Sequence, residues 1–409
     1  MSAPRSAVVV GGGIAGSATA IALTKAGIAT TVLEARSTAA DLDGVMLTVA
    51  TNGINALRAI DADHCVTGLG FPTPTITLRT HTGKRLGDTF TGGLLPDGTQ
   101  SQTVRRADLS AALRDEARRR GVTIREDSRV ERVAEHPHGV RAVLADGAVV
   151  ESDILIGADG VHSTVRSYID PEAPRPAYAG LLTTGGYASA VEVDANPGGY
   201  EMIFGRRAFF GYAVAPDGEI WWFVNLPEPK EPPRTQLRAV PAQRWRETFQ
   251  RVYADDAGPA LDLVAATPDF APMTSIHTMA HLPRWHTDRM IVVGDAAHAP
   301  SPTSGQGASL SIEDAVVLAT ALRDARTPAE AFAGFESVRR PRVEKIIKAA
   351  ARINNTKAPG PVGRLLRDLM LPTILRLTAD TKSARETYEY RVEWAGPGAS
   401  ALGSRTELS

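Results

Sequence analysis

Short apolar runs alternate with helix-period segments over the first part of the chain. Residues 7–10 form a β-branched run, followed by a glycine-rich turn and a small-residue helical stretch that ends near Gly27. A second apolar run, residues 30–33, ends at Glu34. This order predicts a β-α-β unit whose parallel strands are buried on both faces of a sheet.

The same periodicities predict further elements along the chain. Helical spacing of apolar residues predicts helices at residues 52–60 and 107–120, and again after Ala331 up to about Glu393, with a break at residues 358–361. Short apolar runs predict strands at residues 123–126, 140–144, 154–156 and 290–293, with a hairpin turn at residues 146–147.

Between residues 174 and 272 the pattern changes to short strands separated by proline and glycine. Strands are predicted at residues 200–204, 208–213 and 220–224, and helical periodicity is clear only at residues 243–253. We therefore expect an inserted, mostly antiparallel sheet, which residues 75–79 and 85–90 join. The fold class is α/β, or α+β overall, with helices at the C-terminal end.

Composition narrows the classes of function. The net charge of −1 creates no field that favours nucleic acid, so a small-molecule substrate is the expected partner. A single cysteine, Cys65, excludes an intrachain disulfide and a cysteine metal cluster, and no metal site is expected. No run approaches the roughly 20 apolar residues of a membrane span. We expect a cytoplasmic protein, as a monomer or homodimer.

The glycine turn is the first segment that carries chemistry. Gly11 permits a tight turn, Gly13 lets the backbone approach a pyrophosphate, and Gly16 allows the helix to pack closely on the strand. The segment, which includes Ile14 and Ala15, opens a helix whose free N–H groups and positive dipole end are expected to face the phosphates. The turn predicts a dinucleotide and does not separate NAD from FAD.

Three acidic positions follow at strand ends. Glu34 closes the second strand, where a carboxylate accepts from ribose hydroxyls. Asp159 lies in the segment Gly-Ala-Asp-Gly at residues 157–160, and Asp295 lies in Gly-Asp-Ala-Ala-His at residues 294–298, each directly after an apolar strand.

The three segments together resemble the flavoprotein hydroxylases of the para-hydroxybenzoate hydroxylase type, the single-component class A FAD-dependent monooxygenases. The second segment is that family's Asp-Gly motif, and the third runs Gly-Asp-Ala-x-His, then a proline, then Gly-x-Gly opening a helix. The matching positions are Gly294, Asp295, His298, Pro302, Gly305 and Gly307, followed by Glu313, Asp314 and Ala315. The resemblance covers residues 7 to about 345.

The resemblance implies a non-covalent FAD and a set of contacts to it. Asp295 would bind the ribityl chain, and the stretch from Pro302 to Gly307 and Ala308 would lie along the isoalloxazine ring. The remaining cofactor positions that it implies are Arg36 and Val130 near the adenosine half, Arg106 at a helix start of the form Arg-x-x-Leu, and Asp159. His298 is expected to be structural, packing behind the flavin and bonding to backbone.

The resemblance also implies an activity. NAD(P)H would be the reductant and O2 the co-substrate, and a flavin C4a-hydroperoxide would hydroxylate an aromatic or polyketide-like small molecule. The alternatives are an epoxidase, a Baeyer–Villiger oxygenase or an FAD-dependent dehydrogenase on the same scaffold, or a non-catalytic binding protein. We assign no catalytic base.

The change in strand pattern and the family resemblance together predict the domain boundaries. We expect a discontinuous Rossmann-like FAD-binding domain at residues 1–74, 91–173 and 273–345, a substrate-binding sheet domain at 75–90 and 174–272, and a C-terminal helical segment at 346–409. Aromatic residues on neighbouring predicted strands are candidates for the substrate pocket: Phe204, Phe210, Tyr212 and Trp222.

Overall fold

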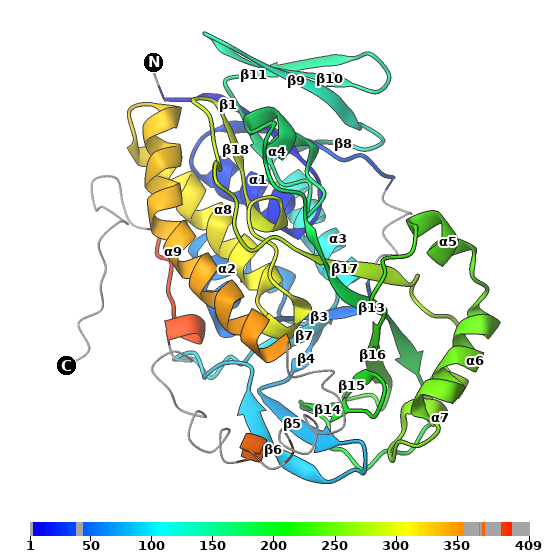
Figure 1. Cartoon of the computed structure of the whole chain (residues 1–409). Helices are drawn as coiled ribbons and strands as arrows, with labels where there is room; N and C mark the ends of the chain where they lie inside the picture. The colour runs from blue at the N-terminus through cyan, green and yellow to red at the C-terminus, as the bar shows by residue number, and fades with distance from the viewer. Residues whose placement is uncertain (1–2, 38–43, 355–367, 369, 373–385, 395–409) are drawn as a thin grey trace.

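Two large sheets, linked by a small three-stranded sheet, organise the chain (Figure 1). The computed structural model describes residues 3–37, 44–354, 368, 370–372 and 386–394. Within these residues, no helix has the length and apolar character needed to cross a membrane.

The first large sheet is parallel throughout, as the β-α-β pattern predicts. Its order is β18-β12-β1-β2-β8, and its strands are β1 (Ser6–Val10), β2 (Ala29–Leu33), β8 (Thr123–Arg125), β12 (Ile154–Gly157) and β18 (Met290–Val292). The central strands are almost fully buried, because layers cover both faces of the sheet.

Helices form one of these layers. Helix α1 (Ile14–Lys25) packs between α3 (Arg106–Arg119) and the buried α8 (Gly307–Asp324), and α2 (Thr51–Ala59) and α9 (Pro328–Asn354) pack against α8. The short α4 (Thr164–Ile169) contacts β12 and β18 and the antiparallel sheet of β9 (Val130–His136), β10 (Gly139–Leu144) and β11 (Val149–Ser152). These layers leave the carboxyl ends of the parallel strands facing the rest of the molecule.

The second large sheet has seven strands in the order β17-β13-β16-β15-β14-β5-β6. They are β5 (Thr75–Thr80), β6 (Arg85–Phe90), β13 (Ala177–Ala188), β14 (Gly199–Phe204), β15 (Phe209–Val214), β16 (Ile220–Pro227) and β17 (Thr274–Thr278). All pairs are antiparallel except β14 with β5, so the mostly antiparallel sheet and the membership of β5 and β6 are confirmed. The sheet continues beyond residue 272, because β17 is its edge strand.

Strand β13 is one of the elements that the sequence pattern did not predict. Its glycines obscure the alternation, and Gly180, at a φ of +72°, lies in a β-bulge against β17. Helices α5 (Arg234–Ala239), α6 (Ala242–Tyr253) and α7 (Ala260–Ala266) cover one face of the sheet. The apolar stripe of α6, with Phe249 and Tyr253 buried, fixes which side of this helix faces the strands.

A three-stranded sheet, β3-β7-β4, lies between the two large ones (β3, Met46–Val49; β4, Gly70–Pro72; β7, Gln102–Arg105). A hydroxyl cluster connects it to the seven-stranded sheet, in which the Tyr200 hydroxyl of β14 lies 2.7 Å from Thr103 Oγ1 and 3.1 Å from Thr48 Oγ1. The predicted helix up to about Glu393 is wrong at its end, because residues 389–394 are not helical; α9 is described as far as Asn354. The predicted break at residues 358–361 lies outside the described residues.

Candidate functional site

The glycine turn after β1 has the form that its spacing predicts. Gly11 has a φ of +102°, and a Cβ there would lie 2.5 Å from the Ala158 carbonyl oxygen. A Cβ on Gly16 would lie 1.8 Å from the Gly11 carbonyl oxygen, so both positions accept only glycine. At Gly13, by contrast, no heavy atom lies within 4 Å of the Cβ position. The turn is therefore closely packed at Gly11 and Gly16. It is open at Gly13 and the start of α1 (Ile14 and Ala15), where a phosphate could approach.

Glu34 is bonded to this turn. Its Oε2 accepts from the Gly12 N–H at 2.6 Å, and its Oε1 accepts from the Arg36 N–H at 2.9 Å. The carboxylate thus fixes the loop after β2 against the glycine turn, with the Arg36 side chain exposed beside it. Val130 is buried at the start of β9.

Asp159 lies after β12 and caps α4. Its Oδ2 accepts from the N–H groups of Thr164 at 2.7 Å and Val165 at 3.1 Å. Burial raises the pKa of this carboxyl, although hydrogen bonds from Ser163 and the backbone act in the other direction. Its other oxygen, Oδ1, is buried without a hydrogen-bond partner among the described residues, as expected beside a site that a polar ligand completes.

Asp295 and the start of α8 face each other at the end of β18. The Asp295 side chain is exposed, yet its surroundings are dense enough that desolvation raises the pKa of its carboxyl, and the positive charge of Arg106 partly offsets this effect. A Cβ on Gly307 would lie 3.9 Å from Asp295 Oδ1. Gly305, at a φ of +60°, turns the chain into α8, whose first turn contains no acidic residue. The positive end of the helix is thus available to an electron-rich group.

Behind this loop lies a buried charge network. Asp314 accepts from the Gly294 N–H at 2.9 Å and from Arg339 Nε at 2.7 Å, and Arg339 Nη1 donates to Glu313 at 2.6 Å. Glu313, Asp314 and Arg339 are fully buried. Arg342 adds two further bonds to Glu313, at 2.8 and 2.7 Å. The network fixes the Gly-Asp-Ala loop to α8 and α9.

The sequence contained a signal for this network. Glu313 and Asp314 are adjacent acids in the middle of a helix rich in apolar residues, and buried carboxylates require cationic or hydrogen-bonding partners. Burial by itself raises the pKa of Asp314, but the charges of His298 and Arg339 outweigh this effect and lower the pKa to about 2. The cationic partners Arg339 and Arg342 come from α9, and no sequence pattern near Glu313 and Asp314 predicts them.

His298 is part of the network. Its Nε2 lies 2.6 Å from Asp314 Oδ2, and the residue is 2% exposed, packed against Trp285. It has the buried, structural position that the sequence predicts, but it bonds to a carboxylate instead of to backbone. The other histidines near it are also paired with carboxylates, His281 with Glu344 and His286 with Glu336.

The predicted pocket aromatics divide between the two faces of the seven-stranded sheet. Phe210, Tyr212 and Trp222 point to the face that α5 to α7 cover, where they join the core around Phe249 and Tyr253. This placement does not support their assignment to the substrate pocket, because strand alternation points them toward the helices. Phe204 lies on the opposite face, packed edge-to-face on Phe209.

That opposite face packs toward the FAD-binding part of the chain. Phe71 of β4 and Met46 of β3 contact it, and the Tyr187 hydroxyl donates to the Val45 carbonyl at 2.8 Å. Its half-buried apolar side chains, which sequence reasoning missed, are Ile76, Met202 and Phe223, beside Trp221 and Tyr187. At its edge, Arg105 pairs with Glu219 at 2.5 Å and lies over the Tyr187 ring.

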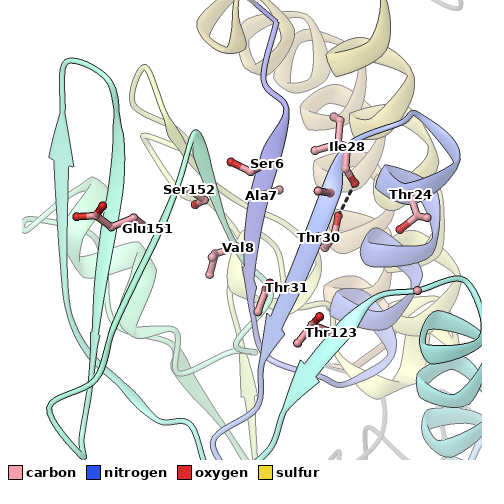
Figure 2. Close-up of a pocket in the computed structure, with 12 residues that line it drawn as sticks. Ser6, Ala7, Val8, Thr24, Ile28, Thr30, Thr31, Thr123, Glu151 and Ser152 are labelled. Carbon is pink, nitrogen blue, oxygen red and sulfur yellow. Dashed lines mark hydrogen bonds between the residues drawn. The ribbon is translucent and has the colours of Figure 1, made fainter.

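A surface pocket of about 250 Å³ lies elsewhere (Figure 2). Its lining comes from the amino ends of β1, β2 and β8, including Ser6, Thr30 and Thr123. Ligands of open α/β sheets bind at the carboxyl ends of the strands, where the glycine turn, Asp159 and Asp295 lie. The pocket in Figure 2 is therefore separate from the candidate site.

Comparison with known proteins decides the family. Residues 5–350 match the model of the family described as "FAD binding domain". The chain belongs to this FAD-binding family. Its residues fit the cofactor: the open space at Gly13, the unpaired Asp159 oxygen and the uncovered start of α8 are features that a bound dinucleotide would use.

Named relatives agree with this assignment. The chain is 28% identical over 356 residues to an FAD-dependent urate hydroxylase of Klebsiella oxytoca, covering 86% of this chain and 90% of the relative. It is 30% identical to the 2-heptyl-3-hydroxy-4(1H)-quinolone synthase of Pseudomonas aeruginosa, covering 87% and 91%. The structure of Klebsiella pneumoniae HpxO with FAD and uric acid superimposes with a TM-score of 0.80 at 25% identity, covering 93% of this chain and 97% of that one.

The protein is accordingly an FAD-dependent monooxygenase, which uses NAD(P)H as reductant and O2 as co-substrate. The predicted fold class and cofactor are confirmed.

Proposed function

We propose that this monooxygenase hydroxylates an uncharged, planar aromatic or polyketide-like molecule held against the cofactor-facing side of the seven-stranded sheet. The observation that carries the proposal is the chemistry of that face. In the described part of the chain, alternation and pairing put no charged residue of the seven strands on it. Arg105 and Glu219, at its edge, neutralise each other.

Apolar and aromatic side chains suit a flat ring. Met202 and Phe223 offer surfaces that pack on a π-system, and a thioether adapts to its edge. A carboxylate placed there would lose water without gaining a cation, and burying an unpaired charge is unfavourable. The names of the relatives fit a planar ring: urate, 3-amino-4-hydroxybenzoate and a 4(1H)-quinolone.

We further propose how the chain holds the cofactor. Gly11, Gly13, Gly16 and the start of α1 at Ile14 and Ala15 would bind the pyrophosphate, with Glu34, Arg36 and Val130 around the adenosine half. Asp159, Arg106, Gly294 and Asp295 would bind toward the ribityl chain, and Pro302, Gly305, Gly307 and Ala308 would line the ring. FAD supplies electron transfer from NAD(P)H and activation of O2.

The chain's own residues position and protect this chemistry. The start of α8 would stabilise negative charge on the reduced ring, because its N–H groups and dipole point outward there. The apolar face around Phe223 would exclude water and orient the substrate ring. The domain boundaries of the sequence analysis, a cytoplasmic location and a monomeric or homodimeric state belong to the same proposal.

Paired compounds test the substrate class. The FAD-loaded enzyme would be given quinolones, hydroxyquinolines and phenols, each with and without a carboxylate, while NADPH oxidation, peroxide and 18O2 incorporation are measured. We expect the uncharged members to stimulate NADPH oxidation and to gain one labelled hydroxyl oxygen. Stimulation confined to the carboxylates would overturn the proposed class, and label in an epoxide or a ring ester would indicate the alternative oxygen insertions.

A further inference from the structure

Two consecutive arginines lie where β7 ends and α3 begins, and the first of them is held on the seven-stranded sheet. Arg105 Nη2 pairs with Glu219 Oε2 at 2.5 Å. The Arg105 guanidinium also lies over two rings of the sheet, 4.2 Å from the centre of Tyr187 and 5.3 Å from that of Trp221. The same Glu219 oxygen accepts from Trp221 Nε1 at 2.7 Å. The Arg105 side chain is therefore committed to the sheet.

Arg106, the first residue of α3, takes a different course. Its side chain is exposed and runs beside Gly44, where a Cβ would lie 3.2 Å from Arg106 Cδ and 3.3 Å from Nη1. Gly44 has a φ of +87° and precedes β3 in the FAD-binding part of the chain. Arg106 is thus the arginine of this pair that suits a cofactor contact, in agreement with the helix-start motif.

The Val45 carbonyl joins Arg106 to the sheet. The first N–H groups of a helix have no partner within the helix, and the Arg106 N–H donates to the Val45 carbonyl at 3.0 Å. The same carbonyl accepts from the Tyr187 hydroxyl at 2.8 Å. Val45 is itself buried against β13, because a Cβ at Gly185 would lie 3.1 Å from Val45 Cγ2.

Tyr187 therefore restrains both arginines from the sheet side. Its ring contacts the Arg105 guanidinium, and its hydroxyl acts on the Arg106 backbone through Val45. Burial raises the pKa of the Tyr187 phenol to about 12, so the phenol keeps its proton and remains a donor. Tyr187 lies in β13, which is far from α3 in sequence.

We propose that Tyr187 is a positioning residue for the cofactor: through the Val45 carbonyl it fixes Arg106 at the start of α3, where that side chain meets the flavin. The inference rests on the Arg106 contact of the proposed function. A guanidinium that is already fixed binds its ligand more tightly, because less freedom is lost on binding. Without the Tyr187 hydroxyl, the loop at Val45 and the start of α3 lose one restraint to the sheet.

The variant Tyr187→Phe removes the hydroxyl and leaves the ring beneath Arg105. We expect the apoprotein, titrated with FAD, to bind it roughly twofold to tenfold more weakly, the factor that the loss of one neutral hydrogen bond produces. The matched control is Tyr253→Phe, which removes a buried hydroxyl that donates to the Phe209 carbonyl at 3.1 Å, within the core beneath α6. Both variants should lose some thermal stability, but Tyr253→Phe should keep the wild-type FAD affinity.

A second variant separates positioning of Arg106 from general loosening. Arg106→Met should weaken FAD binding by itself, and adding Tyr187→Phe should weaken it no further, because no guanidinium is left to position. If Arg106→Met binds FAD weakly, then wild-type affinity in Tyr187→Phe, an equal loss in Tyr253→Phe, or additive losses in the double variant would overturn the inference alone. Wild-type FAD affinity in Arg106→Met would overturn the proposed Arg106 contact and the inference with it.

Discussion

The loop that we propose binds the cofactor and the sheet face that we propose binds the substrate are held in place by different kinds of interaction. The loop at Gly294–Ala296 is held from behind by fully buried charges, with Asp314 bonded to the loop N–H and to Arg339. The sheet face is apolar, and its side chains such as Met202 and Phe223 are only half-buried. Helices α5 to α7 pack on the other face of this sheet.

This difference separates two requirements of the enzyme. Electron transfer and oxygen activation need a fixed dipole and a fixed ring, and buried hydrogen-bonded charges orient a loop with little freedom. Substrate recognition needs only a surface of suitable shape, which substitutions can alter at little cost to stability. Substitutions at the cofactor end should therefore abolish folding or FAD binding, whereas substitutions on the sheet face should change substrate selectivity.

The largest expected effects lie in the glycine turn. Gly16→Ala should not fold, because its Cβ would overlap the Gly11 carbonyl oxygen. Gly13→Ala should fold, since Gly13 has a φ of −77° and open space around it, yet its methyl group would meet the pyrophosphate. Circular dichroism and FAD titration measure both. Normal FAD affinity in Gly13→Ala would show that the pyrophosphate lies elsewhere.

The next effect tests the charges behind the loop. Arg339→Met removes the guanidinium that bonds to both Asp314 and Glu313, leaving Asp314 with His298 and Glu313 with Arg342. We expect the free energy of unfolding to fall by about 3–5 kcal/mol. FAD should also be retained more weakly, because the network holds the Gly294 N–H. Denaturant unfolding of the apoprotein and the flavin content measure these effects.

Arg244→Met is the matched control for Arg339→Met. Arg244 pairs with Glu247 on the exposed side of α6, with 73% of its side chain accessible. Removing it should change the free energy of unfolding by less than about 0.5 kcal/mol. Equal losses in the two variants would mean that the buried network has no special role.

A smaller effect is expected from pH. The folded pKa of Asp314, about 2, is below its ordinary value of 3.8, so its ionised form stabilises the fold. This contribution, on the order of 2 kcal/mol, is complete above pH 4 and is lost as the pH falls toward 2. The free energy of unfolding, measured with urea between pH 5 and 3, should depend less steeply on pH in Asp314→Asn than in the wild type. An unchanged slope would contradict the assignment.

The two regions also differ in how far the sequence could predict them. Gly11, Gly16 and Asp295 lie in short contiguous motifs whose geometry is set by their immediate neighbours, so the cofactor end and the parallel sheet were predictable. Arg339, by contrast, reaches the loop network only through folding of a distant segment. Phe210 and Phe223 differ by strand phase, and β13, which sets part of that register, was hidden by its glycines.

The decisive measurement compares one residue from each face of the sheet. With an uncharged ring compound that stimulates the wild type, Phe223→Ala and Phe210→Leu are assayed for the substrate KM and for peroxide formed per NADPH. We predict that Phe223→Ala raises KM about tenfold or more and increases peroxide, as expected when a ring contact worth about 1.4 kcal/mol or more is lost. Phe210→Leu should lower only the thermal stability, because its side chain belongs to the core beneath α6. The reverse pattern, with KM altered by Phe210→Leu and not by Phe223→Ala, would contradict the placement of the substrate on the cofactor-facing side.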